Sequence, residues 1–152
     1  MHGLDTEQQI FFYEQEFYVF SNFSSFKLEW KGEMWMTSEH AYHSEKFEDE
    51  DILEQLRNSS SAHDSMKIAY AYKDKYRKNW DEVKLQVMKD ILHAKVEQHP
   101  YVKKKLLESG DKELIENSWR DDFWGWGPNK DGNNQLGKLW MEVRDEVRSH
   151  IN

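Results

Sequence analysis

Four side chains with useful chemistry follow one another at helical spacing near the start of a predicted helix. Glu39 is followed by Tyr42, His43 and Lys46 at intervals of three, four and seven residues, which places all four on one helical face. The helix dipole favours the ionised form of a carboxylate in the first turn, so Glu39 is a candidate general base or stabiliser of a cation. Taken alone, the spacing favours a simpler interpretation, in which Glu39 only caps the first turn.

The two histidines of this helix raise the alternative of a metal site. His40 and His43 are three residues apart, and the run Glu-His-Ala-Tyr-His differs from the His-Glu-x-x-His signature of zinc proteases. No third ligand stands out, although catalytic zinc needs three protein ligands. We therefore predict no metal and no cofactor, and interpret His40 as a structural or cleft histidine. For Lys46 the sequence leaves three roles open: a phosphate clamp, a Schiff-base amine and an ordinary surface lysine.

A second group of candidates lies between residues 117 and 135, where neither helical nor strand periodicity is present. Tryptophan and phenylalanine are mixed there with glycine, aspartate and asparagine, and a long loop inside a compact domain usually serves a function. We interpret the aromatic residues as a structured wall. Asp121 and Asp122 could supply a second carboxylate, because glycoside cleavage commonly uses two. Gly125 permits a close approach of the backbone to a ligand.

The elements that must position these residues are strands near the start of the chain and helices after them. Aromatic-rich runs predict four short strands, at residues 10–13, 17–20, 26–30 and 34–36. Gly32 suits the turn of a hairpin between the last two. Thr37 and Ser38 are natural N-caps for a helix to about residue 47. Further helices are predicted at residues 62–76, 80–98, 101–107 and 136–151. Trp80 could either pack into the core or stack on a base.

Length, charge and composition narrow the class of protein. A chain of 152 residues fits a single domain. Its net charge of −8 disfavours a polymeric nucleic acid partner, because that binding depends on Lys and Arg contacts with phosphate. A small phosphorylated ligand needs only a few local cations. The chain has no cysteine, which excludes disulfides and thiol nucleophiles. It has neither an apolar run of membrane-spanning length nor the apolar region of a signal peptide, so we expect a soluble, cytoplasmic protein.

Motifs in a fixed order along most of the chain carry a resemblance to a known family. They are Phe20-Ser21-Asn22-Phe23, Thr37-Ser38-Glu39-His40-Ala41-Tyr42 with Lys46-Phe47, Arg77-Lys78-Asn79-Trp80, Asp121-Asp122-Phe123-Trp124-Gly125-Trp126-Gly127 and Gly132-Asn133-Asn134-Gln135-Leu136-Gly137. Through them the chain resembles the NADAR (YbiA-like) family, whose members include N-glycosidases of riboflavin-biosynthesis intermediates. The chain departs from the family pattern at His43, where Gln is usual, and at Trp126, where Asp or Gly is frequent.

The resemblance implies a mainly helical α+β fold in one domain over residues 1–152, with a core of about 10–149 and a small N-terminal antiparallel sheet. It also implies a hydrolase that cleaves the ribosyl N-glycosidic bond of phosphorylated riboflavin intermediates and releases ribose 5-phosphate. Two alternatives stay open: an ADP-ribosyl-guanine hydrolase and a non-catalytic module that binds ADP-ribose or NAD. The expected partner is a small phosphoribosyl or ADP-ribosyl molecule. Nucleic acid is expected only as ADP-ribosylated guanine, a membrane is not expected, and the oligomeric state stays open.

On this resemblance we expect Glu39 to be the catalytic carboxylate, Asp121 the second carboxylate, and Lys46 a third catalytic residue. The expected substrate-binding residues are Asn22, His40, Tyr42, Trp80, Trp124, Gly125 and Asn134. The two tryptophans would stack on the heterocycle, and the two asparagines would hydrogen-bond the sugar or the base. We further expect the start of the helix at Glu39 and the loop near Trp124 to face each other across one pocket.

Overall fold

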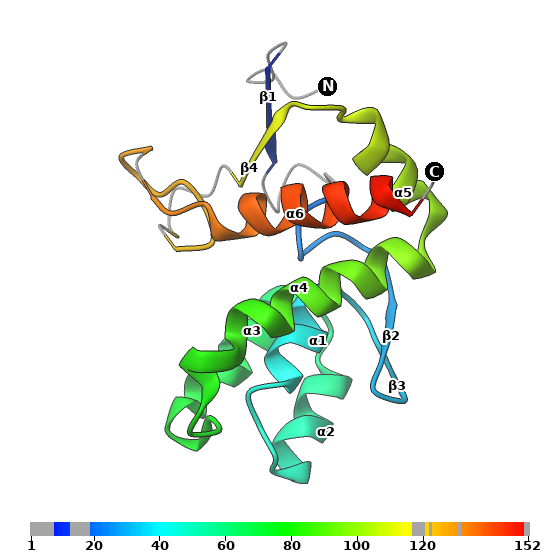
Figure 1. Cartoon of the computed structure of the whole chain (residues 1–152). Helices are drawn as coiled ribbons and strands as arrows, with labels where there is room; N and C mark the ends of the chain where they lie inside the picture. Colours follow the sequence, from blue (N-terminus) through cyan, green and yellow to red (C-terminus); the bar gives the residue numbers. More distant parts are fainter. Residues whose placement is uncertain (1–7, 13–18, 117–120, 122, 131, 151–152) are drawn as a thin grey trace. The chain divides into compact units, whose positions relative to one another are not determined.

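A computed structural model describes residues 8–12, 19–116, 121, 123–130 and 132–150 (Figure 1). The chain divides into two compact units: residues 1–21 and 99–152 form unit 1, and residues 22–98 form unit 2. Among the described residues there are six α-helices, one 3-10 helix and four short strands. The predicted class, a mainly helical α+β fold, is confirmed.

Unit 2 begins with the predicted antiparallel hairpin. Strand β2 (Leu28–Trp30) pairs with β3 (Glu33–Trp35). The two residues of the connection, Lys31 and Gly32, have φ of 52° and 84°, as a tight hairpin turn of the I′ type requires. Leu28 and Trp35 are opposite each other in the register and both are buried, so one face of the hairpin packs on the core of unit 2.

Four α-helices follow the hairpin: α1 (Ser38–Ser44), α2 (Glu50–Asn58), α3 (Ala62–Ala71) and α4 (Trp80–Gln98). The side chains of Thr37, Asp49 and Ser61 cap the first three by accepting bonds from backbone N–H groups of the first turn, which satisfies donors that no helical carbonyl can reach. The prediction for α4 was correct at both ends. Helix α3 ends earlier than predicted, and a 3-10 helix (Lys73–Lys75) follows it.

Helix α1 lies at the centre of unit 2. All seven of its residues are buried, and it packs against α2, α3, α4 and the β2–β3 hairpin. Side chains from several of these elements, including Leu28, Leu56, Ile91 and Leu92, are fully buried in the same unit. The helix that carries Glu39 is therefore held from several sides, which restricts the positions that its side chains can adopt.

Unit 1 joins the two ends of the chain in a short parallel sheet. Strand β1 (Gln9–Phe12) pairs with β4 (Glu113–Glu116), with Ile10 opposite Leu114 and Phe11 opposite Ile115. The sequence predicted β1 within the antiparallel sheet and did not predict β4, so this pairing is a correction. The strand predicted at residues 17–20 falls partly outside the described residues; Val19 and Phe20 form a turn.

Two helices complete unit 1: α5 (Pro100–Glu108) and α6 (Gln135–Ser149). Helix α6 packs on β4, and Gly137 is the point of closest approach. A Cβ atom at Gly137 would collide with the carbonyl oxygen of Leu114 and the side-chain amide of Asn134. Trp140, which is fully buried, donates from Nε1 to the carbonyl oxygen of Phe20 at 2.9 Å.

No helix in the described part of the chain has the length and apolar character needed to cross a membrane.

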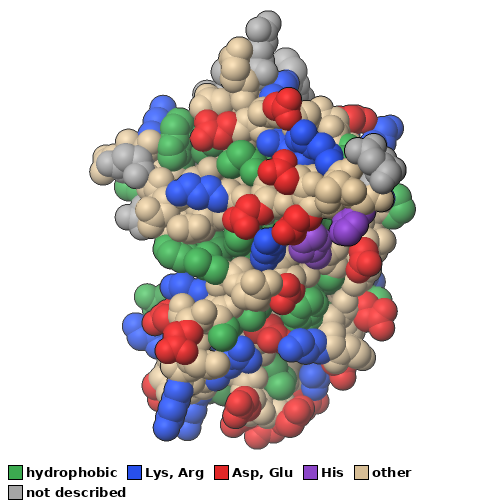
Figure 2. Space-filling model, viewed as in Figure 1, with side chains coloured by type: hydrophobic (Ala, Val, Ile, Leu, Met, Phe, Trp, Pro, Cys, Tyr) green, Lys and Arg blue, Asp and Glu red, His purple; other side chains and the backbone are tan. Residues whose placement is uncertain are grey.

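Figure 2 shows acidic side chains gathered over the α2 region of unit 2. The cap and first turn of this helix contain Asp49, Glu50 and Asp51. These carboxylates are favourable at a helix N-terminus, so the capping of α2 accounts for them.

Candidate active site

Glu39 is fixed in unit 2 through both its backbone and its side chain. Its N–H donates to the carbonyl oxygen of Asn22 at 3.0 Å, although Asn22 belongs to the loop that precedes the hairpin. Its carboxylate oxygen Oε2 lies 2.6 Å from Nε2 of His43, one turn further along α1. Glu39 is only 9% exposed and His43 only 4%. The Glu39 carboxylate therefore has a buried hydrogen-bond partner in His43. A carboxylate that only capped the first turn of the helix would not need such a partner.

His43 is held as a neutral ring. Burial lowers its pKa, and Glu39 opposes this by attraction and by their hydrogen bond, while Lys46 lowers the pKa further. Among the residues that the structure describes, none accepts or donates a hydrogen bond at Nδ1. A neutral imidazole with its proton on Nε2 donates to the Glu39 carboxylate and leaves that carboxylate its full negative charge.

Lys46 lies in an aromatic cage, which we define as Tyr42, Tyr76 and Trp80. Its Nζ is 5.1, 4.8 and 5.7 Å from the respective ring centroids and 3.4 Å from the hydroxyl oxygen of Tyr76. Burial lowers the pKa of Lys46 to about 8, with Glu39 acting in the opposite direction and Lys84 adding to the decrease. The cage stabilises the ammonium form, but the low pKa leaves a substantial fraction of neutral amine near pH 8.

Tyr76 is a site residue that the sequence did not reveal. It lies after α3, and its ring packs edge-on against Phe47 at 5.3 Å, so only the tertiary fold brings it to Lys46. His43 lies on the same helical face as Glu39, but it is not among the site residues that the sequence predicts. The four-residue interval from Glu39 was the signal that could have identified it.

The other predicted residues of unit 2 lie close to α1 or α4. Tyr42 and Trp80 are in contact, with ring centroids 5.2 Å apart. Asn22 donates from Nδ2 to the sulfur of Met88 at 3.3 Å, and its buried Oδ1 accepts no hydrogen bond from any described residue. His40 is fully buried, with Nδ1 2.8 Å from the Thr37 hydroxyl, and burial lowers its pKa.

Asp121 organises the tryptophan-glycine loop of unit 1. Its Oδ1 accepts bonds from the N–H groups of Phe123 at 2.9 Å and Trp124 at 2.8 Å. Asp122, its predicted alternative, lies outside the described residues. The rings of Phe123 and Trp124 stand edge to face, with centroids 4.8 Å apart. Asp121 therefore has a local structural role in addition to any chemical one.

Backbone bonds attach the same loop to β4 and to the start of α6. The carbonyl oxygen of Gly125 accepts from Asn134 N–H at 2.9 Å, and that of Trp124 accepts from Leu136 N–H at 3.0 Å. The Asn134 side chain accepts from Glu116 N–H and donates to the Leu114 carbonyl, both at 2.9 Å. Hydrogen bonds thus order the described part of the predicted wall. The side-chain amide of Asn134 is already bonded to two backbone groups of β4.

The structure therefore brings the predicted residues together in two sets. Glu39, His40, Tyr42, Lys46 and Trp80 gather on and beside α1, with Asn22 bonded to the first turn. Asp121, Trp124, Gly125 and Asn134 form one loop of unit 1. The expected pocket between the two sets joins residues of different units and stays a prediction.

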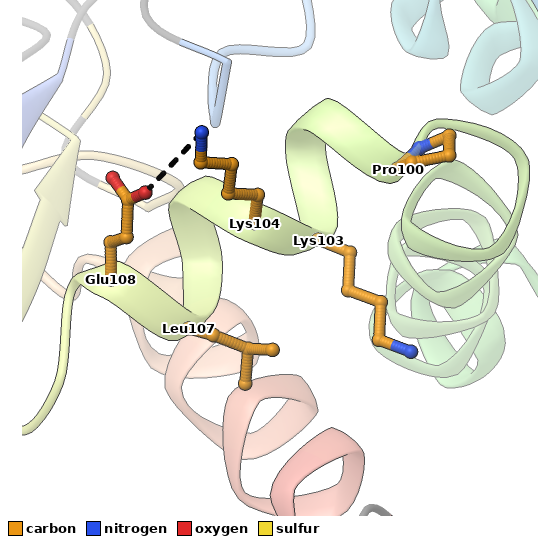
Figure 3. A pocket seen from close by; sticks show the side chains of 5 residues that line it. All are labelled: Pro100, Lys103, Lys104, Leu107 and Glu108. Atoms are coloured by element: carbon orange, nitrogen blue, oxygen red, sulfur yellow. Dashed lines mark ion pairs between the residues drawn. The ribbon is translucent and has the colours of Figure 1, made fainter.

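A shallow surface hollow lies along α5 and is lined by Pro100, Lys103, Lys104, Leu107 and Glu108 (Figure 3). It contains none of the candidate residues. In the part of the chain that the structure describes, no three His, Asp or Glu side chains gather as the ligands of a metal ion would.

Comparison with known proteins identifies close relatives. The family model described as NADAR domain matches residues 11–148. N-glycosidase YbiA of Escherichia coli (strain K12) is 38% identical over 128 residues, which cover 84% of this chain and 80% of that protein. A riboflavin biosynthesis protein of Vibrio vulnificus (strain YJ016) is 34% identical over 146 residues, 95% of this chain and 40% of that protein. The NMR structure of the E. coli protein YbiA superposes with a TM-score of 0.83 at 34% identity, covering 95% of this chain and 89% of that one.

Proposed function

This chain belongs to the NADAR family and hydrolyses N-glycosyl bonds, and we propose that its substrate is a phosphorylated intermediate of riboflavin biosynthesis from which it releases ribose 5-phosphate. The name of the Vibrio relative supports this substrate class. The observation that carries the proposal is the arrangement on α1, where a buried carboxylate and a lysine of lowered pKa lie within two helical turns and beside aromatic rings.

Glu39 is the catalytic carboxylate in this proposal. Cleavage of a ribosyl N-glycosidic bond develops positive charge at C1 as the leaving nitrogen takes the bonding electrons. An ionised carboxylate stabilises that charge or orients the attacking water by accepting its proton. The neutral His43 donor supports this role, because it holds Oε2 without neutralising the carboxylate.

Lys46 has two roles that the proposal separates. As an ammonium it would bind the phosphate of the substrate. As a neutral amine it would attack C1, so that the leaving nitrogen departs with the bonding pair and takes a proton, and the ribose opens to an imine that water hydrolyses to regenerate the amine. The pKa of about 8 supports the second role, because about a quarter of the lysine is neutral at pH 7.5.

Asp121 is the proposed second carboxylate, which binds ribose hydroxyls or assists proton transfer. Its Oδ1 already accepts two backbone hydrogen bonds within the turn, so Oδ2 would act on the substrate.

We propose that Trp80 and Trp124 stack on the heterocycle, while Tyr42 and His40 complete the binding surface of α1. Asn22 would donate or accept at the sugar; its buried Oδ1, which bonds to no described residue, supports this. Asn134 and Gly125 would contribute through the backbone of the loop that they hold together.

The test is product analysis of the purified protein with three candidate substrates: the phosphoribosyl intermediates of riboflavin biosynthesis, NAD and ADP-ribosylated guanosine. We expect ribose 5-phosphate from the first and no turnover of the other two. ADP-ribose as the only product would overturn the proposed substrate and support de-ADP-ribosylation instead. Binding of ADP-ribose or NAD without any product would contradict the catalytic assignment altogether.

A further inference from the structure

We infer that His43 is a positioning residue for Glu39, which it holds through a hydrogen bond from Nε2–H to Oε2. The inference rests on the proposed function, because it takes Glu39 as the catalytic carboxylate. Among the residues that the structure describes, His43 provides the one hydrogen bond to this carboxylate. The bond therefore selects which carboxylate oxygen is held and leaves Oε1 to meet the reacting centre.

The geometry makes this contact a fixed one. Both residues lie on α1, whose seven residues are all buried, and the 2.6 Å separation is at the short end for a bond to a charged acceptor. The Tyr42 ring packs on the His43 ring, with centroids 5.3 Å apart. Neither the helix nor the ring can move without disturbing the core of unit 2, so the carboxylate is held in one orientation before substrate arrives.

The charge state of His43 determines how it acts on Glu39. Burial keeps the ring neutral at pH 7, and the charges that act on it are those of Glu39 and Lys46. From the neighbouring helices, Lys84 of α4 acts on Lys46 and Asp64 of α3 acts on His40. A neutral donor orients the carboxylate and preserves its charge, whereas an imidazolium would form an ion pair that weakens it as a base or cation stabiliser.

This mechanism predicts how activity depends on pH. At neutral pH the active form has an ionised Glu39 and a neutral His43. Protonation of His43 would turn the neutral donor into an imidazolium paired with Glu39, and this form is the less active one. A residue that donates to Glu39 but cannot take up a proton would remove this route to inactivation.

Two substitutions separate positioning from packing. The amide nitrogen of Gln occupies nearly the place of Nε2, so His43→Gln keeps the donor and loses the titration. We expect it to retain kcat within about fivefold at pH 7.5 and to shift the acid limb of the pH profile to lower pH. His43→Leu keeps the apolar packing and loses the donor. We expect kcat to fall about 10- to 100-fold while KM changes less than about threefold, because the carboxylate loses the bond that orients it.

The experiment distinguishes failure of this inference from failure of the proposed function. Wild type and Glu39→Gln are assayed first: a wild type without ribose 5-phosphate product, or a fully active Glu39→Gln, contradicts the proposed function itself. If both behave as expected, equal losses in the two His43 variants, or pH profiles that match the wild type, overturn the positioning role.

If His43→Leu does not fold, the inference is tested by NMR titration of the His43 ring. Glu39→Gln removes the carboxylate that raises the pKa of His43, so we expect the ring to titrate at lower pH in this variant than in the wild type. An unchanged His43 titration would show that the two side chains do not interact and would overturn the inference.

Discussion

At the scale of single residues, Glu39 is the group on which turnover depends. We expect Glu39→Gln to lower kcat about 100-fold or more while KM changes little, because the amide retains the shape and the His43 contact but cannot stabilise positive charge. Steady-state kinetics with the riboflavin intermediate measure this. Glu48→Gln is the matched control, since Glu48 is exposed two residues after Lys46, and it should have wild-type kinetics. Normal turnover of Glu39→Gln would refute the assignment.

Lys46 can be assigned by chemical trapping. If the neutral amine forms an imine, borohydride added during turnover should leave a covalent ribose phosphate adduct that mass spectrometry locates at Lys46. The yield should rise as pH increases from 7 to 9, because the neutral fraction grows through the pKa of about 8. Lys46→Arg provides the control: it keeps a cation for phosphate but cannot form the imine. Turnover without an adduct, together with an active Lys46→Arg, would support the phosphate clamp.

At the scale of elements, Asp121 combines a structural and a proposed chemical role, and two variants separate them. Asp121→Asn keeps the Oδ1 acceptor that bonds Phe123 and Trp124, so we expect kcat to fall with little change in melting temperature. Asp121→Ala removes the acceptor as well, and should also cost about 1 kcal/mol of unfolding free energy. Kinetics and thermal unfolding are measured in parallel. Wild-type kcat in Asp121→Asn would exclude a role for the charge.

The contact between α6 and β4 should be sensitive to a single methyl group. In Gly137→Ala the new Cβ meets the Leu114 carbonyl oxygen and the Asn134 amide, and neither can move without breaking the bonds that fix the loop. We expect a loss of about 2–4 kcal/mol in the free energy of unfolding, measured with denaturant. Lys138→Ala, at an exposed position of the same helix, should change it by less than about 0.5 kcal/mol.

At the scale of the whole molecule, a buried lysine makes stability depend on pH. Lys95 is 1% exposed, donates to the Ser24 hydroxyl at 3.0 Å, and burial lowers its pKa to about 7. Because an unfolded lysine titrates near pH 10.4, the unfolded chain binds more protons between these two pH values. Lys95 therefore lowers the free energy of unfolding at pH 7 and below. This unfavourable contribution becomes smaller as pH rises above 7.

We expect the free energy of unfolding to increase from pH 7 to pH 9 in the wild type and to increase less in Lys95→Met. The slope from one such group is at most about 1.4 kcal/mol per pH unit, and Lys46 adds a similar contribution above pH 8. Denaturant unfolding at several pH values measures the slopes. Lys103→Met, an exposed control on α5, should leave the slope unchanged. Parallel curves for wild type and Lys95→Met would contradict the role of Lys95.

The elements that could be predicted from sequence are those whose signals are local. The apolar period of α4 and the Thr37 cap of α1 specify both helices without knowledge of their neighbours. Helix α2 was missed because it buries only Ile52 and Leu56 among its otherwise polar residues.

Strand β4 was missed because it is four residues long and its partner lies at the other end of the sequence. The same limit applies to the site. The interval from Glu39 to Lys46 is local and was predictable, whereas the contribution of Tyr76 to the aromatic cage and the burial of Lys95 depend on packing between segments distant in the chain.

The β1–β4 pairing has a consequence for the order of assembly during synthesis. Residues 22–98 are contiguous, so unit 2 can fold as soon as they have left the ribosome. Strand β1 emerges earlier, yet its hydrogen-bonding partner, Glu113–Glu116, is among the later segments to be translated. The nascent chain must therefore keep the apolar edge of Ile10 to Phe12 without this partner until residues 113–116 have been translated.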